Sequence, residues 1–553
     1  MSITETTLAD NRGNESRHTE STERTESTER TKSTERKNSA ATQAAQELRN
    51  LAEKIITRAT TAAQNGDGFD QTERASWNSV LQIGFQAMQL FVALQGDGDL
   101  GPHVQTEDGK TLIRSKTSTA TILRSVFGEH TFKQFTYAAG KRKAIELRPV
   151  SARMSLPQCR WTHLLQEFSQ VFCVEQAYGQ AAANLKLVLN DEFSVDTVEA
   201  INQNMGRSAG AFLADLPKPE PDSEAKLLVA SADCKGVPLI KEDNEKVPAF
   251  ETAKKNPGNR KMATVTSVYT VDPHVRTPEE ITAALFREDR AAAETAVQGI
   301  AAEPDAKPAR PEPQNKNTTA HFPTTTTDES GESNIISGIL VGVAWIMNQI
   351  ALRRRVGQIL IVLMDGQESL WNAFAERLPF TQKTVPILDI LHALAYVWKA
   401  AGLFCTTKAE RMAFTRMRLL RILNGEVLSV VRGLRQMGTT HKLKGEDLKT
   451  LTTVCNYLQH NASRMRYDEY LRRGYPIASG VIEGACRHLV KDRMERSGMR
   501  WTLEGARNML NVRAAHQGDH WRKFLNDHIA NDTAKAHPHR NLIQHYKPTI
   551  LPC

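Results

Sequence analysis

The chain has 553 residues, a formal net charge of +8 at pH 7 and an isoelectric point near 9.0. This length predicts several domains, and the basic charge suits a polyanionic partner. The seven cysteines include no C-x-x-C pair, which argues against a zinc ribbon and against a disulfide scaffold. No apolar segment is long enough to cross a membrane and the N-terminal residues are polar, so we expect a cytoplasmic protein without a membrane partner.

The first part of the chain divides into a polar tail and a folded region. Residues 1–40 are low in complexity, with STER repeats of period six from Ser21. We expect a disordered tail here, because such a tract cannot bury enough surface to offset its chain entropy. Residues 41–150 carry helical apolar patterns and then the alternating stretch ILRSVFGEHTFKQFTYAAGKRKAIEL, so this region is expected to be helical and then β-rich.

Residues 151–222 are predicted to be helical and to contain a candidate DNA reader. EQAYGQAAANLKLVLN reads as one helix and SVDTVEAINQNM as a second, which Ser194 caps. Together they resemble a helix-turn-helix, whose second helix would enter the major groove. A helical hairpin packed on the following domain fits the same pattern. In the first interpretation the candidate DNA contacts are Thr197, Asn202 and Asn204.

Three acids further along are placed where a metal site needs them. Asp233 in KLLVASADCKGVP and Asp365 in GQILIVLMDGQESLW follow short apolar runs that read as buried strands. Glu483 begins a basic predicted helix in GYPIASGVIEGACRHLVKDRMERSGMRW. Acids at the C-terminal ends of strands lie where open α/β sheets bind ligands, and carboxylates are ligands of Mg²⁺. The alternative for Glu483 is a salt-bridged surface.

Four segments in the same order resemble the DDE transposases of bacterial insertion sequences, specifically the ISKra-type group. They are SADCKGVP, LMDGQESLW, LDILHALAYVWKAAGLF and GYPIASGVIEGACRHLVKDRMERSGMRW, and the resemblance runs from about Lys226 to Trp521. It implies an α/β ribonuclease H-like catalytic domain over residues 223–405 and 474–525. Residues 406–473 would be a helical insertion within that domain, and the mostly helical region before it would bind DNA.

The resemblance also implies roles for single residues. Asp233, Asp365 and Glu483 match the catalytic triad and would hold two Mg²⁺ or Mn²⁺ ions, with Asp233 bridging them. Asp389 and His392 match an Asp/Cys-x-x-His pair of related transposases and are expected beside the site. The alternative for His392 is a histidine satisfied in the domain interior.

Cations follow Glu483 closely. Glu483, Arg487 and Lys491 are four residues apart, which would place them on one helical face. The basic stretch predicts contacts with DNA phosphates that carry no sequence information. The expected DNA-binding residues here are Arg487, Lys491, Arg493, Arg496, Arg500 and Trp501. Trp501 could stack on a base or pack in the interior.

Further elements complete the prediction. Capping boxes at Thr277/Glu280 and Thr407/Glu410 each open a helix, and the second helix is expected to run to Gly438. Residues 302–333 are rich in proline, threonine and charge, so we expect a flexible insert. Residues 526–553 are expected to form a C-terminal tail.

The sequence therefore predicts a DNA transposase that cuts at insertion-sequence ends and transfers strands into target DNA. A homo-oligomer on DNA and association with the bacterial nucleoid are implied by the resemblance only. Two alternatives remain open. One is a ribonuclease H-like nuclease or resolvase, and the other is a transposase-derived DNA-binding protein without catalysis.

Overall fold

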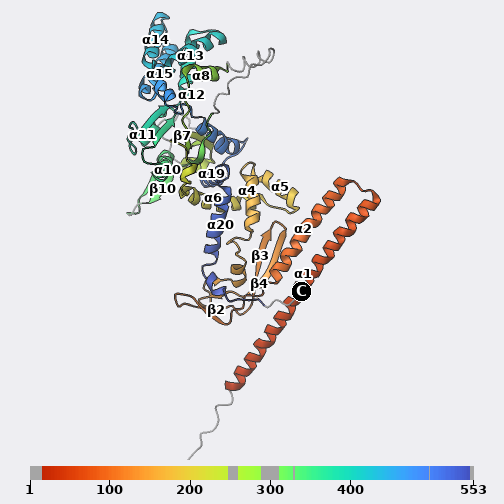
Figure 1. The fold of residues 1–553 in the computed structure, drawn as a ribbon. Helices are drawn as coiled ribbons and strands as arrows, with labels where there is room; N and C mark the ends of the chain where they lie inside the picture. The colour runs from red at the N-terminus through yellow and green to blue at the C-terminus, as the bar shows by residue number, and fades with distance from the viewer. Residues whose placement is uncertain (1–14, 247–259, 288–309, 328–329, 497, 549–553) are drawn as a thin grey trace, which may run out of the picture. The chain divides into compact units, whose positions relative to one another are not determined.

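A computed structural model describes residues 15–246, 260–287, 310–327, 330–496 and 498–548 (Figure 1). The chain divides into two compact units. Unit 1 comprises Met1–Cys173, Tyr178–Ile201 and Leu525–Cys553, and unit 2 comprises Val174–Ala177 and Asn202–Phe524. Each unit is described by itself below.

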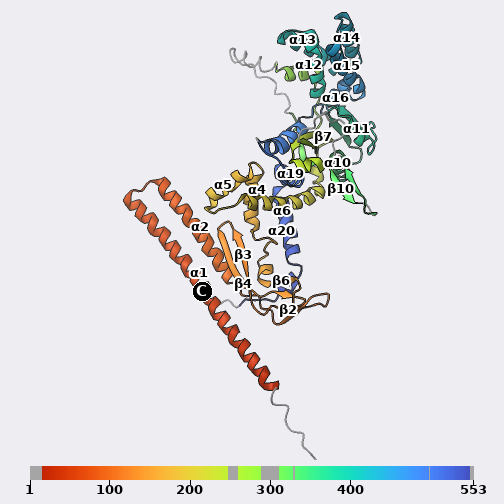
Figure 2. The same ribbon diagram turned by 180° about the vertical axis from the view of Figure 1, so that it is seen from behind.

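Unit 1 begins with two long helices, α1 (Glu15–Asn65) and α2 (Phe69–Ala93), which form an antiparallel pair (Figures 1 and 2). Gly66, with φ of 67°, takes the left-handed conformation in the turn between them. Helix α1 covers much of the tract that was expected to be a disordered tail over residues 1–40, and residues 1–14 lie outside the described residues. Glutamate and arginine in the STER repeats are good helix formers, which is the physical reason for a helix from Glu15 onward.

The β-rich part of unit 1 is as predicted. Strands β3 and β4 form a hairpin, and a separate four-stranded sheet has the order β1-β2-β5-β6. Their bounds are β1 His103–Gln105, β2 Thr111–Arg114, β3 Thr119–Ser125, β4 Gly128–Gln134, β5 Tyr137–Ala138 and β6 Ile145–Leu147.

The segment expected to be a C-terminal tail is instead part of unit 1. Ile543 packs in a core with Leu112, Tyr137 and Leu147. The Tyr546 hydroxyl accepts from a backbone N–H of the loop after α2 and donates to a carbonyl there. These two apolar and aromatic side chains bury surface that a free tail would expose, so the tail prediction is wrong for the described residues up to 548.

The helices of unit 1 follow the predicted order. Ser194 caps α6 by accepting from the Thr197 N–H at 3.1 Å, as the sequence indicates. Helices α6 and α20 each contain a boundary between the units. The bounds are α3 Pro149–Arg153, α4 His163–Cys173, α5 Tyr178–Leu189, α6 Val195–Ala214, α20 Trp521–Ala536 and the 3-10 turn η4 Arg540–Ile543.

Unit 2 is built on a five-stranded mixed sheet with the strand order β13-β12-β7-β8-β9. Strand β12 is parallel to both of its neighbours, whereas β8 is antiparallel to both of its neighbours. The bounds are β7 Leu227–Pro238, β8 Arg260–Val271, β9 Gln314–His321, β12 Ile359–Met364 and β13 Thr384–Leu388. The first six residues of β7 are buried without alternation, which is typical of a strand covered on both faces.

Strand β9 corrects one prediction. Residues 302–333 were expected to be a flexible insert, but Gln314–His321 pairs with β8 and the hairpin β10 (Thr324–Thr327) and β11 (Ser333–Ile336) follows. The β-branched threonines of this segment favour a strand despite its polarity. Residues 302–309 lie outside the described residues.

Helix α10 packs on the sheet of unit 2, and helix α11 follows one of the strands of that sheet. Helix α10 (Gly338–Arg353) packs against β8 and β9, and Ser337 caps it by accepting from the Leu340 N–H. At its other end Arg353 forms a two-pronged ion pair with Glu224, with N···O distances of 2.8 and 3.0 Å. Helix α11 (Glu368–Ala375) follows β12. Two shorter helices are α7 (Lys241–Lys246) and α8 (Pro278–Phe286), and α8 begins with the predicted capping box.

The predicted helical insertion is helical, and it shares one hydrophobic core with the sheet. Its helices gather together in both views (Figures 1 and 2). The helix opened by the Thr407/Glu410 capping box ends at Leu423 rather than at Gly438, because Gly425 turns the chain with φ of 82°. The elements of the insertion are α13 Lys408–Leu423, α14 Val427–Thr440, α15 Gly445–His460, η2 Ala462–Arg464 and α16 Tyr467–Arg472, and α12 (Ile390–Phe404) precedes it.

The last helices of unit 2 contain an interruption. Helix α17 (Gly480–Ala485) continues into a π-helical turn, η3 (Cys486–Lys491), and then into α18 (Asp492–Met494). Helix α19 (Leu503–Gln517) begins separately, with Thr502 as its N-cap. π-helical turns are rare in proteins, but those that occur are often found at functional sites. Among the described helices, none is long and apolar enough to cross a membrane.

Candidate active site

Three aspartates continue one register across three neighbouring parallel strands, Asp233 within β7 and Asp365 and Asp389 directly after β12 and β13. In the register of β7 and β12, Leu227 pairs with Ile359 and Ala230 pairs with Val362, so paired residues are always 132 positions apart in the sequence. Asp233 and Asp365 have the same separation. In the register of β12 and β13, Met364 faces Leu388, so the next residues are Asp365 and Asp389. Because adjacent strands lie about 4.8 Å apart, the row gathers three carboxylates at one end of the sheet.

Asp233 lies within β7 rather than at its end, because β7 continues to Pro238 in its pairing with β8. It nevertheless lies past the last pair that β7 makes with β12. One carboxylate oxygen accepts from the Cys234 N–H at 2.6 Å, and the other accepts from the Cys486 thiol at 3.3 Å. Burial, followed by the charge of Asp233, raises the pKa of the Cys486 thiol, so this thiol stays protonated and donates.

Asp365 occupies the turn after β12. Its side chain accepts from the Gln367 N–H at 2.9 Å, and its carbonyl accepts from the Trp371 indole at 2.6 Å. Burial, together with the negative charges of Asp233 and Asp389, raises the pKa of Asp365, while the hydrogen bond from Gln367 opposes that rise.

The helical insertion holds the Asp365 turn from two sides. A Cβ atom placed on Gly366 would lie 2.3 Å from the ring of Tyr457 on α15, so the backbone and the ring are in direct contact. Tyr457 stacks on Tyr396 of α12 with ring centroids 3.6 Å apart. The Arg464 guanidinium lies 4.2 Å from the centroid of the Trp371 ring. The turn therefore cannot move without disturbing the insertion.

Asp389 is fully buried and joins three elements. As the N-cap of α12, it accepts from the His392 N–H and, at 2.7 Å, from the His392 ring. Its other oxygen accepts from the Ser479 N–H at 2.9 Å, just before α17. The hydrogen bond with Asp389 raises the pKa of His392 to about 9, in spite of partial burial. His392 is therefore a cation among the carboxylates at neutral pH.

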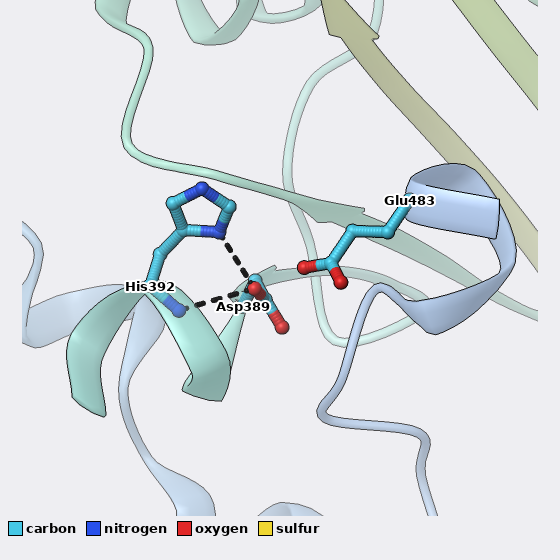
Figure 3. A group of neighbouring side chains, drawn as sticks. All are labelled: Asp389, His392 and Glu483. Carbon is cyan, nitrogen blue, oxygen red and sulfur yellow. Dashed lines mark hydrogen bonds and ion pairs between the residues drawn. The ribbon is translucent and has the colours of Figure 1, made fainter. Parts of the chain in front are cut away.

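Glu483 projects from α17 toward Asp389 (Figure 3). One potential ligand atom from each of Asp389, His392 and Glu483 lies within 4.8 Å of the others. Burial and the charge of Asp389 raise the pKa of Glu483, and the His392 cation opposes this. Within the described part of the chain, Asp233 and Asp365 lie outside this tight group, although their charges act on its members.

The π-helical turn after Glu483 changes the expected helical face. Its hydrogen bonds run from residue i to residue i+5, so the four-residue spacing of Glu483, Arg487 and Lys491 no longer keeps them on one face. The guanidinium of Arg513 on α19 donates to the carbonyl of Leu489 at 2.8 Å and to that of His488. Buried Arg513 thus satisfies carbonyl groups of the turn that presents Glu483 and Cys486.

Four of the predicted DNA-binding residues after Glu483 are exposed, and two are not. Arg493 is fully buried, with its guanidinium 4.8 Å from the ring centroid of buried Trp501. The Trp501 backbone pairs with residues at the end of β7, through Pro238 and Ile240. DNA contact by Arg493 and Trp501 is therefore wrong for this structure, because both fill the interior. The exposed residues are Arg487, Lys491, Arg496 and Arg500.

The predicted recognition helix also buries its key residues. The Thr197 side chain is nearly buried, and its hydroxyl pairs with that of Ser194 at 2.9 Å. Asn202 is fully buried, with its amide 4.0 Å from the Met509 sulfur. Neither can contact DNA without rearrangement, so these two predictions are wrong. Asn204 is half-buried, and its contact with DNA stays a prediction.

Sequence reasoning missed the residues that support the acids. They are Cys486, Ser479, Tyr457 and Arg513, and each acts through a contact with a residue distant in sequence or through a backbone atom. None of these four residues belongs to a sequence motif that its spacing from the acids would reveal. Only the position of Cys486, one turn after Glu483, offered a signal.

Comparisons with protein-family models and with curated protein sequences find no match. The chemistry is therefore argued from the residues alone. Two of the clustered acids have raised pKa values, and each is raised in part by another acid of the cluster. A divalent cation would relieve that repulsion, and carboxylate oxygens are the ligands that Mg²⁺ and Mn²⁺ favour. The donor set therefore fits such an ion.

Proposed function

We propose that the protein is a DNA transposase that cuts DNA at the ends of an insertion sequence and joins those ends to target DNA. The row formed by Asp233, Asp365 and Asp389, which Glu483 approaches from α17, carries this proposal. Such a cluster of acids suits phosphoryl transfer, in which positioning and neutralisation of charge supply most of the catalysis.

The fold supports the proposal at a coarser level. Strands that end in acids form a mixed sheet, and a helical block separates Asp365 from Glu483 in sequence. A ribonuclease H-like domain with a helical insertion before its last glutamate is what the resemblance implies. We therefore include that fold class in the proposal.

Within this proposal, Asp233, Asp365 and Glu483 would hold two Mg²⁺ or Mn²⁺ ions. When bound, such ions activate the attacking oxygen and stabilise the leaving oxygen. Asp389 has a different role, because both of its oxygens already accept hydrogen bonds from His392 and Ser479. It is a positioning residue that fixes the starts of α12 and α17, and the His392 cation offsets part of the acidic charge.

The proposed reaction has two displacements at the same acids. Water attacks a phosphodiester at the end of the element, one P–O bond forms as another breaks, and a 3′ hydroxyl is released. That hydroxyl then attacks a phosphodiester of the target: the new P–O bond replaces the bond from phosphorus to the target's 3′ oxygen, the attacking hydroxyl gives its proton to solvent, and the released 3′ oxygen takes up a proton. The DNA partner and a homo-oligomer that pairs two ends are parts of the same proposal.

The test incubates purified protein with Mg²⁺ and a supercoiled plasmid that carries the DNA flanking its own gene. Glu483→Gln is the inactive candidate, and Glu368→Gln is the matched control because Glu368 is exposed on α11 outside the cluster. We expect cleaved ends and joined products from the wild type and the control, and neither from Glu483→Gln, which should still bind DNA. Cleavage without joining would replace the proposal with a nuclease or resolvase. Binding without cleavage under Mg²⁺ and Mn²⁺ would replace it with a DNA-binding relic.

A further inference from the structure

The helical insertion holds the whole net charge of the protein. Residues 406–473 contain 14 lysines and arginines and six acids, a net charge of +8, which equals the net charge of the entire chain. The rest of the chain is therefore balanced. A charge concentrated in one segment generates a much stronger local potential than the same charge spread evenly.

Five of the six acids of this segment are already engaged with near neighbours in sequence. Glu410 caps α13, and four others form ion pairs with residues three to five positions away. These pairs are Arg421–Glu426, Lys449–Glu446, Arg466–Glu469 with Arg473–Glu469, and Arg472–Asp468. Surface pairs of this kind leave little carboxylate to neutralise other cations.

Several cations of α13 and α14 have neutral partners instead. The guanidinium of Arg418 lies over the ring of Phe414 and 3.0 Å from the Met437 sulfur. Arg435 donates to the side-chain amides of α15, with its closest contact to Gln459 at 2.7 Å. Among the described residues of the insertion, no carboxylate pairs with Arg418 or Arg435.

A surface pocket of about 330 Å³ lies between α13 and α14, and Arg418 is one of its lining residues. Its arginines are Arg418 and Arg421, of which Arg421 also pairs with Glu426, and its polar lining residues include Gln436, Thr440 and His441. No aspartate or glutamate lines it. At Gly433 an added Cβ would meet nothing within 4 Å, so the backbone leaves the pocket floor open to a ligand.

We propose that this pocket, named here the α13–α14 pocket, binds backbone phosphates of duplex DNA. The inference rests on the proposed function for its choice of DNA over other phosphate-bearing ligands. Arginine suits phosphate because its planar guanidinium donates two parallel hydrogen bonds. The insertion therefore supplies a second DNA-binding surface, formed by residues other than the cations that follow Glu483.

The test measures binding of a short fluorescein-labelled DNA duplex of arbitrary sequence by fluorescence anisotropy over a range of salt concentrations. The pocket variant is Arg418→Gln with Arg421→Gln, and the matched control is Arg472→Gln with Arg473→Gln, which removes the same charge from two exposed side chains at the end of α16. Each lost phosphate contact lowers the slope of log K against log salt by about 0.9. We expect a slope lower by about 2 in the pocket variant and an unchanged slope in the control.

A second pair of variants tests the same proposal independently, in case the arginine variants do not fold. Thr440 lines the pocket, whereas Thr439 is an exposed neighbour on the same helix that does not line it. Thr440→Asp should weaken DNA binding by roughly tenfold through repulsion of phosphate. Thr439→Asp, which adds the same charge to the same turn, should change it much less. Unfolding curves followed by circular dichroism confirm that each variant is folded.

The outcomes separate this inference from the proposed function. Equal effects of the pocket and control variants would overturn the inference, even if the wild type cuts and joins DNA. A selective loss of binding in the pocket variants would support it, even if no cleavage occurs. Inorganic pyrophosphate is the competing probe. If pyrophosphate binds the wild type while the pocket variants leave DNA binding unchanged, the pocket serves a free phosphate compound. The assignment of DNA as the ligand then fails.

Discussion

Asp233 and Asp365 continue the register of β7 and β12 beyond its last pair, because their separation of 132 residues equals that of every register pair between the two strands. Burial disfavours the ionised form of a carboxyl group, and a second acid nearby adds to the cost. The raised pKa of Asp365 is the consequence. Such an arrangement is costly in the absence of a cation, which is why it points to a binding site for one.

Asp365→Asn should therefore have opposite effects with and without metal. Without metal we expect the variant to unfold at a higher temperature than the wild type, because ionisation of a group with a raised pKa opposes folding at neutral pH. With Mg²⁺ or Mn²⁺ the wild type should gain thermal stability, and the variant should bind the ion at least tenfold more weakly, about 1.4 kcal/mol. Thermal unfolding and titration calorimetry measure both effects.

The control for this experiment is Glu368→Gln, three residues away and exposed. It should leave the metal response unchanged. A metal-induced gain in stability that persists in Asp365→Asn would remove Asp365 from the ligand set and favour the tighter group of Asp389, His392 and Glu483.

Gly366→Ala should destabilise the Asp365 turn. The new Cβ would lie 2.3 Å from the Tyr457 ring, which is held by its stacking on Tyr396. Overpacking of this kind costs about 1–3 kcal/mol of unfolding free energy. We expect urea unfolding to show that loss, with a parallel loss of the metal response.

The double variant Gly366→Ala, Tyr457→Ala tests the cause. Removal of the ring gives the new methyl group space, so the two changes together should cost less than the sum of the single changes. Strict additivity would mean that Tyr457 does not hold the turn.

Much of the sheet could be predicted because short apolar runs and polar boundaries are local signals. The runs before Asp233 and Asp365 are strands, Asp389 caps α12, and both predicted capping boxes form. Each depends on residues within a few positions of one another. The metal and catalytic roles of the three acids stay predictions.

The predictions that proved wrong concern residues whose surroundings are set by contacts between parts of the chain that are distant in sequence. A tryptophan and an arginine in a basic stretch suggest DNA contact, yet Arg493 and Trp501 bury each other. Asn202 is polar but lies in the interior against α19. The register that aligns Asp233 with Asp365 follows from strand pairing, which sequence spacing alone does not give.

Arg513→Met should destabilise the π-helical turn beyond Glu483. The side chain is buried, and its loss removes the guanidinium donor from the carbonyl of Leu489 and from that of His488, which keeps only the Gln517 amide at 3.4 Å as a side-chain donor. An unsatisfied buried group costs about 1–3 kcal/mol, so we expect a loss of about 2–5 kcal/mol in unfolding free energy by urea denaturation. Arg500→Met, on an exposed residue close in sequence, should change it by less than about 0.5 kcal/mol. Similar small values for both variants would show that Arg513 does not hold the turn.

The buried Arg353–Glu224 pair should make the stability of unit 2 depend on pH in acid. Burial alone would raise the pKa of Glu224, but the hydrogen bonds from Arg353 and Thr270 outweigh it and lower that pKa. The native state then binds fewer protons than the unfolded state, so this contribution to stability is complete above the unfolded pKa of about 4.3. It is lost as the pH falls through the lower pKa of the folded state.

Glu224→Gln keeps the shape of the side chain and leaves Arg353 buried without a counter-charge, which should cost about 3–5 kcal/mol at neutral pH. The difference in unfolding free energy between the wild type and the variant should shrink as the wild-type carboxylate becomes protonated in acid. Urea unfolding at neutral pH and at several values below the unfolded pKa measures this difference. Glu376→Gln breaks an exposed pair with Arg377 and should cost less than about 1 kcal/mol at any pH. A difference for Glu224→Gln that stays constant into acid would mean that the charge of Glu224 does not stabilise the fold.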